Sequence, residues 1–132
     1  MANEGMTPEE IVNECNRLIM DHRALEAVER FIADDFIEHS PAVRGGNREG
    51  FIEHLVNSGF TDPSRPKMKM TLDRSFYAGD MVVTHVHVEM GPGDPVLVFM
   101  DIYRVEGGKI AEHWDVMQAV PEESINGRVT MY

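Results

Sequence analysis

Hydrophobic residues recur at helical spacing through the first sixty residues and alternate with polar residues from Lys67 onwards. Apolar side chains three or four positions apart mark one face of an amphipathic helix, whereas alternation marks a strand with one buried face. The pattern predicts helices over about residues 7–20, 23–33 and 47–58, and then an antiparallel sheet from Lys67 to Ala119.

Capping residues support the predicted helix boundaries. Thr7-Pro8-Glu9-Glu10 supplies an N-cap, a proline at the first helical position and the glutamate of a capping box. Asn47 can cap the third helix, and Gly59 can end it. The apolar faces predicted for the three helices are Ile11, Cys15, Leu18 and Ile19, then Leu25, Val28, Phe31 and Ile32, then Phe51, Ile52, Leu55 and Val56.

Turn residues divide the second half of the chain into strands. Ala78-Gly79-Asp80, Gly91 to Pro95 and Gly107-Gly108 separate segments with β-branched or alternating residues. Helices followed by an antiparallel meander predict an α+β fold with the helices on one sheet face. Such a twisted sheet curls and leaves a concave side that can hold a ligand. A chain of this length predicts one domain over residues 1–132.

Composition restricts the class of partner. The net charge of −11 opposes binding to nucleic acid, because phosphate backbones attract basic surfaces. The longest apolar runs are strand-sized, so no membrane helix is expected. The N-terminal residues have no signal-peptide pattern, and the single cysteine, Cys15, excludes an intramolecular disulfide. These features predict a cytoplasmic protein.

Two aspartates interrupt apolar strand sequence and are candidates for chemistry. Asp101 follows Val98-Phe99-Met100, and Asp115 follows His113-Trp114 in the last predicted strand. A buried carboxylate in a strand is unfavourable unless it has a partner or a function. The alternative is that each aspartate faces solvent or pairs with Arg104 or Lys109.

The register of the last hairpin decides whether the two aspartates share a face. A two-residue Gly107-Gly108 turn places Met100 opposite Asp115 and turns Asp101 to the other side. A three-residue loop with Gly108 as a bulge places Asp101 opposite His113, and Phe99 opposite Asp115. A slip of one residue exchanges the two faces, so both registers remain open. We favour the bulged loop, which puts Phe99, Asp101, Tyr103, His113 and Asp115 on one face.

Histidines supply the other candidate groups. His85 and His87 share one face of a strand, whose opposite face is more apolar and can also be the core. They can line a pocket or bind a metal with His39, His113 or the aspartates, although such a histidine pair is common by chance. A histidine beside a carboxylate also suits acid–base catalysis. His22 and His54 occupy polar helix positions and are expected to be solvated.

Several segments resemble the SnoaL-like polyketide cyclase group of the nuclear-transport-factor-2-like superfamily. They are Phe36-Ile37-Glu38-His39-Ser40-Pro41, Gly46, Glu49-Gly50-Phe51-Ile52, and the run from Asp101 to Asp115. The resemblance implies a cone-shaped α+β barrel with three N-terminal helices on a strongly bent antiparallel sheet that encloses a pocket, usually dimeric through the sheet. It also implies an acid–base aspartate at Asp115, whereas a histidine usually stands where this chain has Asp101.

Together these observations predict a cofactor-independent acid–base enzyme that acts on a small carbonyl compound by aldol-type cyclisation, isomerisation or a related proton abstraction. The predicted catalytic residues are Asp115, Asp101 and His113, and the predicted substrate-binding residues are His39, His85, His87, Phe99, Tyr103 and Met117. No metal ligands and no cofactor are predicted, and a homodimer through the sheet is expected. The alternatives are a non-catalytic protein that binds a small molecule and a metal-binding protein that uses His85 and His87.

Overall fold

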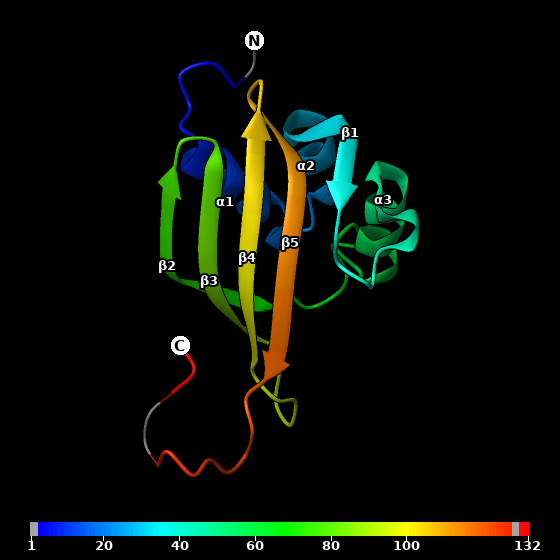
Figure 1. Cartoon of the computed structure of the whole chain (residues 1–132). Coiled ribbons are helices and arrows are strands. Elements are labelled where there is room, and N and C mark those ends of the chain that lie inside the picture. The colour runs from blue at the N-terminus through cyan, green and yellow to red at the C-terminus, as the bar shows by residue number, and fades with distance from the viewer. Residues whose placement is uncertain (1–2, 128–129) are drawn as a thin grey trace.

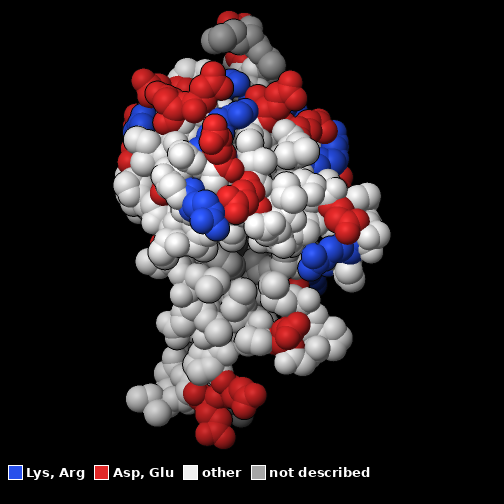
Figure 2. Space-filling view, turned by 90° about the vertical axis from the view of Figure 1, so that its right-hand side faces the viewer, with Lys and Arg blue, Asp and Glu red and all other residues white. Residues whose placement is uncertain are grey.

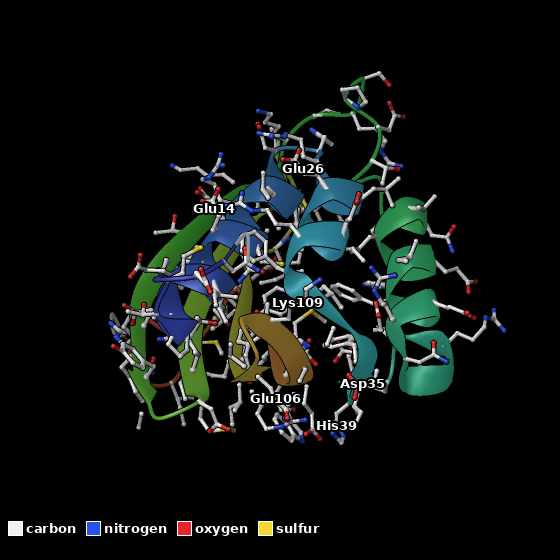
Figure 3. The ribbon with its side chains drawn as sticks, turned by 90° about the horizontal axis from the view of Figure 1, so that it is seen from above. Glu14, Glu26, Asp35, His39, Glu106 and Lys109 are labelled. Atoms are coloured by element: carbon white, nitrogen blue, oxygen red, sulfur yellow. The ribbon has the colours of Figure 1, made fainter. Side chains whose placement is uncertain are left out.

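The computed structural model describes residues 3–127 and 130–132 and combines three helices with one curved sheet (Figure 1). The helices are α1 (Pro8–Met20), α2 (Ala24–Phe31) and α3 (Arg48–Asn57), with a short 3-10 turn η1 (Arg44–Gly46) before α3. The strands are β1 (Ile32–Glu38), β2 (Lys69–Ala78), β3 (Met81–Glu89), β4 (Leu97–Glu106) and β5 (Lys109–Ala119). The strand order is β1-β5-β4-β3-β2. The bent sheet and the helices on its concave side confirm the predicted cone-like α+β fold, although the sheet is not closed into a barrel (Figures 1 and 3).

The helix boundaries follow the caps that the sequence provides. Thr7 Oγ1 accepts a hydrogen bond from the Glu10 amide at 3.1 Å, and the Glu10 carboxylate accepts one from the Thr7 amide. Asn47 Oδ1 accepts from the Gly50 amide at 2.9 Å at the start of α3. Leu25 and Val56, which were expected on buried faces, are exposed instead. The helices therefore begin and end near the predicted positions, but α2 buries Ala24, Ala27, Val28 and Phe31.

The sheet contains one strand that the sequence pattern did not predict. Residues 32 and 33 were expected to extend the second helix, but Ile32–Glu38 forms β1, which runs parallel to β5. The sheet is therefore mixed rather than wholly antiparallel. Phe36 and Glu38 are buried while Ile37 between them is 44% exposed. The hydrophobic alternation that marks a strand is thus broken here by a buried acid and an exposed isoleucine.

The hairpin between β4 and β5 corrects the favoured register. Glu106 pairs with Lys109 across a two-residue turn, in which Gly107 and Gly108 have φ of 59° and 79°. Two positive φ values are typical of a type I′ turn, which matches strand twist and is readily formed by glycine. The predicted three-residue loop, with Asp101 opposite His113 and Phe99 opposite Asp115, is wrong.

A β-bulge in β5 nevertheless brings the two aspartates to one face. Val105 pairs with Ile110, but Arg104 pairs with Glu112, so Ala111 is an extra residue in β5. The extra residue shifts the register by one position. As a result Asp101 lies opposite Asp115, and Tyr103 lies opposite His113.

The hydrophobic core and an open space divide the concave side of the sheet. The buried faces of α1 and α2 pack against Val82, Tyr103, Val105 and Ile110. The other end of the strands extends beyond the helices (Figure 1). Of the helices in the described part of the chain, none is long and apolar enough to cross a membrane.

Candidate active site

A cavity of about 590 Å³ lies between the concave face of the sheet and the helical side of the molecule. The sheet contributes the apolar side chains of Met70, Val86, Val88, Leu97 and Phe99. The end of α1 and the segment after α3 contribute Ile19, Met20, Phe60 and Pro66. Figure 2 shows a hollow at mid-height, with uncharged residues around it and most charged side chains above it. A cavity of this size and lining suits a small, largely apolar molecule.

Two carboxylates stand on the sheet wall of this cavity. Asp101 and Asp115 both line it and form a cross-strand pair of β4 and β5. Asp101 is 7% exposed, and Asp115 is half-buried. Burial raises the pKa of Asp115; the charges of Asp101 and Glu38 raise it further, and His113 opposes them. Asp115 therefore takes up a proton at a higher pH than an ordinary aspartate.

His113 bridges two buried carboxylates. Its Nε2 lies 2.8 Å from Asp101 Oδ1, and its Nδ1 lies 2.8 Å from both carboxylate oxygens of Glu38. Burial lowers the pKa of His113, but the hydrogen bonds to Asp101 and Glu38 outweigh it and raise this pKa from 6.5 to about 9. At neutral pH His113 is therefore an imidazolium that donates from both ring nitrogens.

Glu38 is a site residue that sequence reasoning missed. Its side chain is 1% exposed and also accepts a hydrogen bond from the Ser40 amide at 2.9 Å. It reaches His113 because the two residues are register partners in β1 and β5. The signal in the sequence was the spacing of Phe36 and Glu38 on one strand face, which becomes informative only when β1 is recognised as a strand.

A phenol and an amide adjoin the buried histidine. The Tyr103 ring stacks on the His113 ring, with centroids 4.6 Å apart, and its hydroxyl accepts a hydrogen bond from Asn16 Nδ2 at 3.2 Å. Burial raises the pKa of Tyr103 well above 10, and Asp101 adds to this. Tyr103 therefore remains a neutral phenol on the cavity wall. Asn16, which sequence reasoning also missed, lies on the same α1 face as Ile19 and Met20, and this helical spacing was the available signal.

The predicted site residues fall into two groups. Phe99, Asp101, Tyr103 and Asp115 line the main cavity, as expected. His113 lines an adjoining cavity of about 140 Å³ that shares Asn16, His54 and Tyr103 with the main one. Met117 is on the same sheet face but is 58% exposed and lies outside the cavity lining, because it is near the end of β5 beyond the helices.

His85 and His87 lie on the opposite face of the sheet, which corrects their expected place in the pocket. Val82, Thr84, Val86 and Val88 take the inner face of β3, because this set is the more apolar. His85 contacts Arg74, and its Nε2 lies 2.9 Å from the Met131 carbonyl oxygen. His87 contacts Asp73 at 2.7 Å and stacks on Tyr132.

His39 also points away from the cavity. Its ring stacks on Trp114 and its Nε2 lies 2.6 Å from Glu112 Oε2. Figure 3 shows the labelled His39 on the outer side of the sheet. The parallel pairing continues past Glu38, with the His39 amide bonded to the His113 carbonyl, so strand alternation directs Glu38 inwards and His39 outwards.

Among the described residues, one group of three side chains could hold a metal ion. One ligand atom each from Asp101, His113 and Asp115 lies within 4.8 Å of the other two. However, both His113 nitrogens already contact carboxylates, and its raised pKa favours the protonated ring. A metal would have to displace a proton and a hydrogen bond, so this geometry suits proton chemistry better.

Comparison with known proteins identifies similar chains. Residues 14–113 match the model of the SnoaL-like domain family. IdmH, a proposed polyketide cyclase from Streptomyces antibioticus, is 21% identical, with a TM-score of 0.67 over 85% of this chain and 92% of IdmH. A protein proposed to be a polyketide cyclase from Bacillus cereus is 20% identical, with a TM-score of 0.68 over 85% of this chain and 75% of that one.

Another similar structure has no assigned activity. It is an NTF2-like protein of unknown function from Cytophaga hutchinsonii, 17% identical, with a TM-score of 0.66 over 85% of this chain and 90% of that one. No curated protein matches the chain. At these identities the structural likeness establishes the fold, and any activity has to be argued from the site.

Proposed function

Because the chain belongs to the SnoaL-like domain family, we propose that it is an acid–base enzyme, a cyclase or an isomerase, that acts without a cofactor on a small carbonyl compound. The observation that carries this proposal is the position of Asp115. It stands on the wall of an apolar cavity, opposite a second carboxylate, with a raised pKa. A base whose pKa is raised towards neutrality is suited to proton transfer at carbon.

Asp115 is the proposed general base. Its carboxylate takes a proton from the carbon next to the carbonyl, and the electrons of that C–H bond form the carbon–carbon double bond of an enolate. In a cyclisation the enolate carbon attacks a second carbonyl of the same molecule, and the new alkoxide takes up the proton that Asp115 removed. In an isomerisation the proton held by Asp115 returns to a different carbon. Either reaction leaves Asp115 as a carboxylate at the end of the cycle.

Tyr103 is the proposed donor to the enolate oxygen. Asp101 Oδ1 contacts His113, and its Oδ2 accepts a weak hydrogen bond from Thr84 at 3.4 Å. Both N–H groups of His113 donate hydrogen bonds to carboxylates. Tyr103 Oη accepts from Asn16, which leaves its own proton available to the cavity. Asp101 and His113, which were also considered as donors, are therefore less suitable than Tyr103.

Strand geometry supports this pairing of donor and base. Tyr103 is two residues from Asp101 on the same face of β4, and Asp101 lies opposite Asp115. Tyr103 and Asp115 are therefore diagonal neighbours across the two strands, a relation that spans roughly 7–8 Å. A carbonyl group and its neighbouring carbon can bridge this spacing, with the oxygen at Tyr103 and the carbon at Asp115.

His113 has a supporting role in this scheme. Its positive charge lies between Glu38 and Asp101 and lowers the pKa of Asp115, against the two carboxylates that raise it. The bridge therefore balances three closely placed acids. Burial alone would favour the neutral, protonated form of Asp115. We infer that the positive charge of His113 offsets this effect and allows Asp115 to ionise.

Deuterium exchange tests the proposal without knowledge of the natural substrate. 2-Tetralone is an apolar ketone, and exchange of the hydrogens next to its carbonyl in D₂O can be followed by NMR. The protein should accelerate this exchange, and Asp115→Asn should reduce the acceleration by at least about 100-fold. Asp94→Asn, in the exposed turn between β3 and β4, is the matched control and should leave the rate unchanged.

Two results would contradict the proposal. Equal exchange rates with the original protein and with Asp115→Asn would exclude Asp115 as the base. Saturable binding of the ketone without accelerated exchange would favour the alternative, a binding protein in which the same groups only orient the ligand.

A further inference from the structure

The helical wall of the cavity carries basic side chains, unlike the sheet wall. His22 follows α1, His54 lies in α3, and Arg65 lies in the segment between α3 and β2. Sequence reasoning placed both histidines in solvent, but each is half-buried at the cavity. Asp101 and Asp115 occupy the sheet wall. The cavity is therefore acidic on one side and basic on the other.

Arg65 is the fixed positive charge of this wall. Within residues 3–127 and 130–132, its guanidinium has no hydrogen bond or ion pair with another side chain. Asp62 lies near enough for an electrostatic interaction with Arg65. However, the Asp62 carboxylate accepts its hydrogen bonds from the amide and hydroxyl of Ser64, at 3.0 and 2.6 Å. An unpaired arginine is notable because acidic residues outnumber basic ones, 23 to 12.

The backbone leaves room for the arginine at this place. The Arg65 side chain lies over Gly59, where a Cβ atom would stand only 2.8 Å from Nε. Gly59 also has a φ of 85°, which glycine adopts without strain. Gly59, two residues after the end of α3, thus leaves room for the guanidinium, and both residues line the cavity.

We propose that the ligand of this cavity is an apolar molecule that carries a carboxylate, and that Arg65 binds this carboxylate. The inference rests on the proposed function, because it places the reacting carbonyl at Asp115. An anionic group is repelled by Asp101 and Asp115 and attracted by Arg65, so the charges of the two walls admit one orientation. An arginine fork also matches the two oxygens of a carboxylate. The ligand therefore lies across the cavity, with its carboxylate at the helical wall and its carbonyl at the sheet wall.

The methionines of the chain provide a direct test by NMR. Met20, Met68, Met70 and Met90 line the cavity, whereas Met100 is exposed on the outer face of the sheet. The probes are 2-naphthylacetate and its neutral amide, 2-naphthylacetamide, which differ mainly in charge. Each is titrated into protein with labelled methionine methyl groups. Both should shift the cavity methyl signals, and the carboxylate should bind about tenfold more tightly than the amide.

Two arginine variants test whether Arg65 causes the preference for the carboxylate probe. Arg65→Gln should remove the tenfold difference, because it weakens binding of the carboxylate probe and leaves binding of the amide unchanged. Arg44→Gln, which changes an exposed arginine paired with Glu53, should retain it. This titration measures binding whereas the exchange experiment measures turnover, so a failure of the exchange experiment and a failure of this one can be told apart. Equal affinities for the two probes, a preference that survives Arg65→Gln, or shifts at Met100 in place of the cavity methionines would overturn the proposal.

Discussion

Glu38 and His113 are register partners of the only parallel strand pair in the described sheet, with the Glu38 carboxylate 2.8 Å from Nδ1 of His113. Because Asp101 holds the other ring nitrogen, the histidine is fixed from both sides. The edge strand β1 thereby contributes to the site through a residue that does not line the main cavity.

We expect Glu38→Gln to lower the pKa of His113. Glutamine can still accept a hydrogen bond, but it removes one of the two negative charges that raise this pKa to about 9. The titration of the His113 ring, followed by NMR, should move towards 6.5. Glu112→Gln is a suitable control, since Glu112 contacts His39 on the outer side of the sheet. An unchanged titration in Glu38→Gln would contradict the charge assignment.

The same pair predicts how stability depends on pH. The folded pKa of His113 lies above the unfolded value, so its contribution is fully present below pH 6.5 and is lost as the pH rises through about 9. The full shift corresponds to about 3 kcal/mol of unfolding free energy. Denaturant unfolding at pH 6 and pH 9.5 should show this loss, and Glu38→Gln should show a smaller one. A flat profile in the original protein would argue against a charged His113.

Asp115→Asn should have the opposite effect on stability. The folded pKa of Asp115 is raised by burial and by neighbouring carboxylates, so its ionisation opposes folding once the pH exceeds the unfolded value of 3.8. We expect the variant to be at least as stable as the original protein at pH 7, with the difference disappearing below pH 3.8. Urea unfolding at the two pH values measures this. Marked destabilisation at pH 7 would indicate a structural role for the carboxylate.

The fold was predictable because its signals are local. Helix caps such as Thr7 and Asn47, and turns such as Gly107-Gly108, act through neighbouring residues and are visible in any window of the sequence. β1 was missed because its pattern depends on tertiary burial. Glu38 is buried only because His113 is available to pair with it, and that contact spans 75 residues.

The candidate site was predictable in part for the same reason. Asp101, His113 and Asp115 share one face as expected. They do so because of a bulge at Ala111, which no turn residue in the sequence indicates. His85 and His87 were predicted in the pocket but lie on the other face, because both faces of β3 are partly apolar and the choice between them depends on which face the helices cover. His22, His54 and Arg65 come from helix ends and a connecting segment, where periodicity carries no information about a shared cavity.

The outer sheet face remains the predicted dimer interface. Cross-strand pairing brings Phe76, Val83, Ile102 and Trp114 into one row, and Met100 and Val116 into the next. Phe76, Met100, Ile102 and Val116 are each at least 40% exposed. Such a contiguous apolar surface is typical of an interaction site, and we propose that a second copy of the chain covers it.

Ile102→Lys should convert the dimer to a monomer, because it places a charge in the middle of this face. Light scattering at micromolar concentration distinguishes the two masses. Leu25→Lys, which changes an exposed leucine of α2, is the control and should leave the mass unchanged. A monomeric original protein would refute the proposed interface.

The last prediction concerns metal binding at the acidic cluster. Asp101, His113 and Asp115 can bring three ligand atoms within 4.8 Å of one another, which is compatible with a bound ion. His113 must be neutral to bind a metal, and with a pKa of about 9 only about 1% of it is neutral at pH 7. Zinc affinity at pH 7 is therefore expected to be about 100-fold weaker than with a neutral ring, and to rise roughly tenfold per pH unit up to pH 9.

Dialysis against a chelator should accordingly leave the melting temperature at pH 7 unchanged, and elemental analysis should find far less than one metal per chain. Calorimetric titration with zinc at pH 7, 8 and 9 measures the expected rise in affinity. His87→Gln should not alter it, because His87 lies on the other face of the sheet with Asp73 and Tyr132. Stoichiometric zinc that survives dialysis at pH 7, or chelator-induced loss of stability, would show that the cluster is a metal site and would replace the acid–base scheme with metal-assisted chemistry.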